Sequence, residues 1–109
     1  MRLKPPAKNS VLLEKYGELM RLWTLPVTYA LGERDHSGFN DLKKRIEGIN
    51  STTLSKTLDL MEKNGLIDRV IIPEKPVRVE YSLTEKGLEF HRIMMELSEF
   101  VENLCAGHE

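Results

Sequence analysis

The chain has 109 residues, of which 16 are Lys or Arg and 17 are Asp or Glu, so that its formal net charge is −1; 40% are hydrophobic. This length and balance predict one globular domain with a modest core. No apolar run approaches the roughly 20 residues of a membrane span and no signal-peptide pattern is present, so no membrane partner is expected. The single cysteine excludes an internal disulfide framework and fits a reducing, cytoplasmic location.

The near-neutral charge counts against nucleic-acid binding, because proteins that neutralise phosphates usually carry excess Lys and Arg. The distribution of charge weakens this objection. Residues 1–50 carry nine Lys and Arg against six Asp and Glu, residues 51–82 carry five of each, and residues 83–109 carry two against six. The acidic excess therefore belongs to the C-terminal part of the chain.

The N-terminal part predicts an arm followed by a helix. Residues 1–9, with a Pro-Pro pair and two lysines, are expected to form a flexible arm ahead of a single domain at 10–109. Leu12, Tyr16 and Leu19 then recur at helical spacing.

A second helix is expected to begin at residues 24–26, because proline is tolerated in the first turn of a helix, and to end at Gly32. Trp23, at its entry, is interpreted as a core anchor.

Two further helices follow, joined by a tight turn. Residues 37–39 are expected to form a short strand, after which Asn40 caps a short helix at 41–46. Gly48-Ile49-Asn50 supplies a residue suited to left-handed geometry and then a helix cap. A recognition helix should therefore begin at Ser51.

The pattern after the turn predicts a buried face and then a hairpin. Leu54, Leu58 and Met61 fall at helical spacing, and Asn64-Gly65 supplies a stop. The run at 66–72, a turn containing two prolines and the alternating run at 77–83 predict two antiparallel strands. Residues 38–84 thus describe a winged helix-turn-helix, in a fold that is mainly α with a small β-hairpin.

The C-terminal segment predicts a long helix at 85–105, capped by Thr84. Its apolar residues are spaced 3, 4, 3 and 4, which is the pattern of a helix-packing seam. Either the N-terminal helix or a second copy of the chain covers this seam; we favour a two-fold dimer with interleaved terminal helices. The expected dimer residues are Leu12, Tyr16, Phe90, Ile93, Leu97, Phe100 and Leu104.

No catalytic or metal-binding constellation is recognisable. His36, His91 and His108 show no ligand spacing, and Cys105 has no activating neighbour except the tail histidine. No Gly-rich phosphate loop is present. We therefore expect neither enzymatic activity nor a metal or other cofactor.

A DNA-binding surface is the functional prediction. Hydroxyl and Lys side chains on the outer face of the recognition helix can enter a major groove, while basic residues of the wing and of the preceding helix contact phosphates. The alternative is that these are capping residues and solvated charges. The candidate DNA-binding residues are Ser51, Thr52, Thr53, Ser55, Lys56, Lys43, Lys75 and Arg78.

Several motifs in order make the chain resemble HxlR-type winged-helix transcriptional regulators, a group related to the MarR-like proteins. They are WTLPV at 23–27, FNDLK at 39–43, GINSTTL at 48–54, NGLIDR at 64–69 and RVEYSLTEKG at 78–87. The resemblance implies a homodimer on a roughly palindromic double-stranded DNA operator, with the helix from Ser51 reading bases and the hairpin tip as the wing.

The chain also departs from this pattern. Members of the family often carry a cysteine before the tryptophan, but residues 15–22 have none, and Cys105 belongs to another element. The recognition helix also carries fewer arginines than is usual, so DNA affinity should be modest or steeply salt-dependent. Two alternatives stay open: a winged-helix module that binds a protein partner through its acidic C-terminal seam, and a sensor of an unidentified small-molecule effector.

Overall fold

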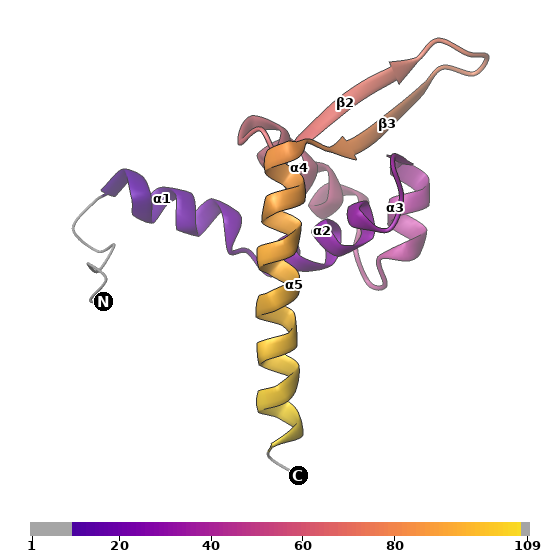
Figure 1. The fold of residues 1–109 in the computed structure, drawn as a ribbon. Helices are drawn as coiled ribbons and strands as arrows, with labels where there is room; N and C mark the ends of the chain where they lie inside the picture. Colours follow the sequence, from indigo (N-terminus) through magenta and orange to yellow (C-terminus); the bar gives the residue numbers. More distant parts are fainter. Residues whose placement is uncertain (1–9, 108–109) are drawn as a thin grey trace.

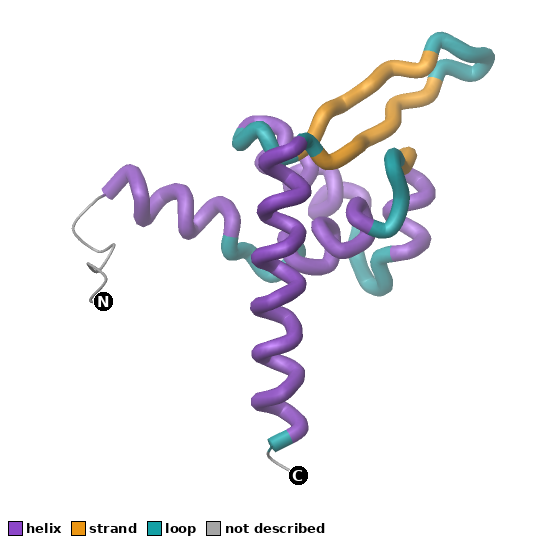
Figure 2. Tube along the Cα trace, in the orientation of Figure 1, coloured by secondary structure: helices purple, strands orange, loops and turns teal. Residues whose placement is uncertain are grey.

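The computed structural model describes residues 10–107, so the arm expected at 1–9 lies outside the described residues. Helices and a small sheet alternate along the chain (Figures 1 and 2). The elements are α1 (Ser10–Leu19), α2 (Thr24–Gly32), β1 (Ser37–Gly38), α3 (Phe39–Arg45), α4 (Ser51–Lys63), β2 (Ile67–Ile72), β3 (Arg78–Leu83) and α5 (Glu85–Ala106).

The core lies where α2, α3 and α4 meet the base of the hairpin. α4 buries the predicted stripe, because Leu54, Leu58 and Met61 are at most 1% exposed, and α2 contributes Val27 and Leu31 to the same cluster. Trp23 packs against this cluster but is only half-buried. The predicted core positions of the recognition helix are confirmed.

The turn between α3 and α4 has the predicted geometry. Gly48 has a φ of 85°, the left-handed region that favours glycine, and the Asn50 side chain accepts a hydrogen bond from Thr53 N at 2.8 Å. Gly65, with a φ of 74°, ends α4 as expected.

The start of α3 differs from the prediction. Its N-cap is Gly38, with no side-chain hydrogen bond, so the expected cap at Asn40 is wrong. Phe39 begins the helix instead of ending the strand. β1 pairs with β3 only through Ser37, opposite Tyr81, and Gly38, opposite Glu80, so the strand ends at Gly38. A partly buried Phe39 that packs against the core fixes this entry to the helix.

The sheet has the order β1-β3-β2 and is antiparallel throughout. The β2–β3 hairpin runs from the core to a tip far from the body, which is the form of a wing (Figure 1). Ile67 opposite Leu83 anchors its base in the core region, whereas Ile71 and Val77 near the tip are exposed.

α1 and α5 project from the body in different directions (Figure 1). α5 packs on α2, and its C-terminal end extends beyond the other elements (Figure 2). Among the described helices, none is long and apolar enough to cross a membrane.

Candidate nucleic-acid interface

The outer face of α4 is exposed along its whole length. Its residues opposite the buried stripe are Ser51, Thr52, Ser55, Lys56 and Asp59, and all five are exposed. None of them makes a side-chain hydrogen bond or ion pair within residues 10–107. This face is therefore free to contact a ligand, and its hydroxyls and one amine offer groups that bond base edges or phosphates.

Thr53 differs from the other α4 candidates. It is half-buried, and its backbone N–H is already held by the Asn50 cap. Its carbonyl accepts a hydrogen bond from the hydroxyl of Thr57 at 2.8 Å, which satisfies a buried polar group that the sequence pattern did not single out.

The C-terminal end of α4 is fastened to α1. Glu18 accepts hydrogen bonds from the Asn64 amide at 3.1 Å and from Lys63 Nζ at 3.3 Å, and Lys15 Nζ donates to Asn64 Oδ1 at 2.6 Å. The Asn64 hydrogen bond, followed by that of Lys63, lowers the pKa of Glu18 below its ordinary value of 4.5. These bonds tie α1 to the C-terminal end of α4.

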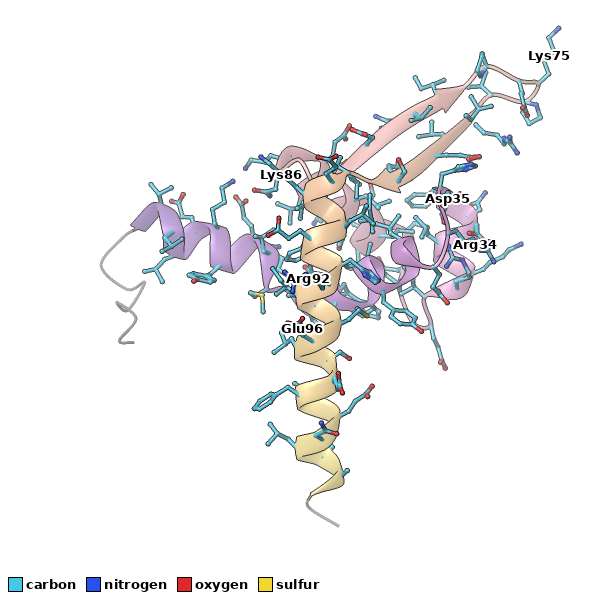
Figure 3. All side chains as sticks on the ribbon, in the orientation of Figure 1. Arg34, Asp35, Lys75, Lys86, Arg92 and Glu96 are labelled. Carbon is cyan, nitrogen blue, oxygen red and sulfur yellow. The ribbon has the colours of Figure 1, made fainter. Side chains whose placement is uncertain are left out.

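Lys75 and Arg78 occupy different positions on the wing. Lys75 points outward at the hairpin tip (Figure 3) and has no ion pair within the described chain. Arg78 contacts Glu74 Oε2 at 3.1 Å and Glu80 Oε1 at 3.9 Å. A phosphate must therefore compete with two carboxylates for Arg78 but not for Lys75.

The three basic residues of α3 divide into two kinds. Lys43 and Lys44 are exposed, with no partner among residues 10–107. Arg45 is 18% exposed and bridges Asp41, Glu33 and Ser37 at 2.7 to 3.0 Å. Its hydrogen bond is the main cause of the lowered pKa of Asp41. Arg45 therefore holds α2, β1 and α3 together, and only its two neighbours are available to DNA.

Sequence reasoning missed Arg21. This residue, from the connection between α1 and α2, lines a groove of about 260 Å³ beside α4 together with Lys56 and Thr53. Both basic side chains are exposed and lack an ion pair within the part of the chain described. No periodicity could have revealed this pairing, because Arg21 belongs to no helix and is 35 positions away from Lys56.

The seven expected dimer residues fall into two groups. Six of them are 37% to 60% exposed: Leu12, Tyr16, Ile93, Leu97, Phe100 and Leu104. Phe90 is half-buried and packs against the core of its own chain. α1 makes its main contacts with α4 and leaves the α5 stripe open, so the N-terminal helix does not cover the seam within one chain.

Other chemistry-bearing groups do not gather into a site. Among residues 10–107, no cluster of His, Cys, Asp and Glu could hold a metal ion. His36 Nδ1 lies 2.6 Å from Glu80 Oε2, which ties the start of β1 to β3, and Cys105 is exposed near the end of α5.

These features define the class of protein: a winged helix-turn-helix with an exposed recognition helix, a projecting wing and two protruding terminal helices. Residues 18–109 match the model of the HxlR-like helix-turn-helix family. The chain belongs to that family, and it is a transcriptional regulator of the helix-turn-helix type.

Known proteins support this assignment. BH0655 of Halalkalibacterium halodurans, an uncharacterised HTH-type transcriptional regulator, is 38% identical over 78 residues, 72% of this chain and 69% of that protein. YtfH of Escherichia coli is 32% identical over 80 residues, 73% of this chain but less than two thirds, 63%, of its own length. The solved structure of YtfH from Salmonella typhimurium matches with a TM-score of 0.83 at 24% identity, covering 97% of this chain and 94% of that one, which shows the shared fold.

Proposed function

We propose that this regulator acts as a homodimer that binds a roughly palindromic sequence in double-stranded DNA. The observation that carries the proposal is the outer face of α4, which is exposed and has no partner inside the described chain although it lies beside a projecting wing. A helix displayed in this way fits the width of a major groove. Regulation by promoter occupancy places the protein in the cytoplasm.

The roles divide between base recognition and backbone contact. Ser51, Thr52, Ser55 and Lys56 face outward on α4 and are assigned to the groove. Thr53, half-buried beside the cap, is assigned a marginal role at the edge of that contact.

Backbone contact is assigned to basic residues around α4. Lys75 at the wing tip and Lys43 on α3 contact phosphates, as does Arg21 from the groove beside Lys56. Arg78 joins them only when DNA displaces its contacts with Glu74 and Glu80. Because few cations are free, affinity should be modest, and the number of phosphate contacts sets how steeply it falls as salt rises.

The dimer supplies the two-fold symmetry that a palindrome requires. The stripe of Ile93, Leu97, Phe100 and Leu104 on α5 is exposed in one chain, as is the apolar face of α1 around Leu12 and Tyr16. Burial of such exposed apolar side chains against a second copy would be the main driving force for association. We assign these faces to contact with a second copy.

The deciding experiment is a selection of random double-stranded DNA with purified protein at low salt, followed by sizing of the complex. The expected result is an enriched inverted repeat, with half-sites about one helical turn apart, bound by two chains. Weak binding with no enriched sequence would reject this proposal.

A second candidate follows from the charge of the same surface. Asp59 lies on the outer face of α4, and Glu74 and Glu80 offset Arg78 on the wing. A winged helix with such a surface can also serve as a protein-interaction module. Retention on heparin at low salt separates the two candidates, because only a DNA-binding surface is expected to be retained.

A further inference from the structure

An apolar recess next to the recognition turn lies between α2, the α3–α4 connection and α5. It has a volume of about 460 Å³ and is walled by Trp23, Tyr29, Pro26 and Met95. Ligand sites in proteins commonly have volumes of about 300 to 1,000 Å³ and are lined by aromatic and apolar side chains with a few polar groups. The recess therefore has the size and lining of a small-molecule site.

The charged groups at this recess are mainly acidic. Glu33, Glu47 and Glu102 line it, and the one base among the lining residues is Arg45. Arg45 is already bonded to Glu33 at 3.0 Å and to Asp41 at 2.9 Å. Glu47 and Glu102 are exposed and have no ion pair within residues 10–107, so two carboxylates stay uncompensated beside two aromatic rings.

We propose that this recess binds an organic cation with an aromatic or apolar body. Indole and phenol rings attract cations through the negative faces of their π-systems, and Met95 offers a polarisable, adaptable contact to the apolar part of the ligand. An anion of the same shape is repelled by Glu47 and Glu102. The site should therefore bind a cation more tightly than an anion of the same shape.

The recess stays clear of the surface assigned to the dimer. Met95, Ser98 and Glu102 share one face of α5, and at 100° per residue this face lies about 160° around the helix axis from the stripe of Ile93 and Leu97. Association through the stripe therefore leaves the α5 wall of the recess open.

Trp23 connects the recess to the recognition helix. Its ring lies near Gly48 in the turn before α4, where an added Cβ would be 3.6 Å from the ring. Trp23 also lines the separate groove that holds Thr53 and Lys56 of α4. A ligand stacked on Trp23 thus contacts a side chain that lies near the turn and lines the groove beside the recognition helix, so binding is expected to change DNA affinity.

The direct test uses tetraphenylphosphonium and tetraphenylborate, which share a shape and differ in charge sign. Trp23 is the only tryptophan, so its fluorescence reports on the recess, with calorimetry as a second measurement. We expect saturable binding of tetraphenylphosphonium to the full chain and binding of tetraphenylborate weaker by about tenfold or more. Equal binding of the two ions, or no binding of the cation, overturns the proposal.

Variants then locate the site. Glu47→Gln and Glu102→Gln are each expected to weaken binding of the cation about threefold, and Tyr29→Ala, at a half-exposed side chain, about fivefold. Glu89→Gln, an exposed carboxylate elsewhere on α5, is the matched control and should leave affinity unchanged. Equal effects at Glu89 and Glu102 would show attraction to overall charge only and reject the site.

The effect on DNA rests on the proposed function and is measured separately. Tetraphenylphosphonium should shift the affinity for the selected DNA in the wild-type chain and not in the Glu47→Gln/Glu102→Gln double variant. If the cation binds but no DNA sequence is selected, the proposed function fails and the site stands. If DNA binds with specificity and the cation does not bind, the site fails and the function stands.

Discussion

Arg45 Nη1 donates a hydrogen bond to the carbonyl oxygen of Ala30 at 2.9 Å, which ties the end of α3 to the last turn of α2. The same guanidinium also binds Ser37 in β1 and the carboxylate of Asp41. One side chain thus joins the three elements that hold the recognition turn in place.

Replacing Arg45 should therefore destabilise the fold. Arg45→Met removes the hydrogen bonds that the charged guanidinium donates to Ala30, Ser37 and Asp41. Asp41 also loses its main partner, so we expect a loss of about 2 kcal/mol in the free energy of unfolding. Urea denaturation measures this loss. Lys44→Met, next to it on α3 and exposed, should change stability by less than about 0.5 kcal/mol. Similar small effects for both variants would contradict the bridging role of Arg45.

Gly87 is required by a close approach between α5 and the connection from α4 to β2. A Cβ at this position would lie 1.9 Å from the carbonyl oxygen of Leu66, a backbone atom that cannot move aside cheaply. Gly87→Ala should lower the free energy of unfolding by about 3 kcal/mol, at the upper end for overpacking. Thermal or urea unfolding measures this change.

Gly17→Ala is the matched control for that substitution, because Gly17 lies inside α1 with nothing within 4 Å of an added Cβ. This variant should gain about 0.5 to 1 kcal/mol from helix propensity. The opposite signs of the two changes separate crowding from a general effect of removing glycine.

Acid should weaken the attachment of α1 to α4. The pKa of Glu18 is lowered by its hydrogen bonds with Asn64 and Lys63, so its contribution to stability is fully present above the ordinary value of 4.5 and is lost as the pH falls below it. Glu18→Gln should therefore flatten the loss of stability between about pH 5 and pH 3. Glu14→Gln, on the same helix and exposed, should retain the wild-type profile. Identical profiles for all three proteins would argue against the link.

The division of roles on DNA can be tested with three single substitutions. Lys75→Ala and Arg21→Ala should weaken binding of all sequences alike and each reduce the salt slope by about 1, whereas Thr52→Ala should change the preferred base. Arg92→Ala removes a charge on α5 away from the wing (Figure 3) and serves as the control. Binding across a panel of operator variants at several salt concentrations measures both quantities. A shared, sequence-independent loss for Thr52 and Lys75 would refute the assignment.

The dimer prediction concerns the exposed stripe of α5. Ile93→Glu with Leu97→Glu places charges where apolar surface must be buried in both copies, so the dissociation constant should rise about a thousandfold or more. Analytical ultracentrifugation measures the association, and circular dichroism checks that the fold is retained. Glu99→Arg, off the stripe on the same helix, should stay dimeric. A dimer that survives the double substitution would place the interface elsewhere.

The sequence alone determined the features that depend on neighbours along the chain. The left-handed Gly48, the Asn50 cap and the buried stripe of α4 could be predicted, because φ preferences, caps and helical periodicity act over a few residues. The run at 77–83 likewise predicted the second strand of the wing, which the structure places at Arg78–Leu83, but its side chains do not alternate between buried and exposed as the sequence pattern indicated.

Features that depend on contacts between distant segments could not be predicted from the sequence. The wrong cap at Asn40 arose because pairing between β1 and β3 fixes where α3 begins. Arg45 could not be distinguished from Lys43 by sequence, since its partners come from α2 and β1. Arg21 likewise became a candidate only when the fold placed it beside α4. The roles of these residues depend on burial and on contacts between segments that are far apart in the sequence. Local sequence preferences do not predict either of these.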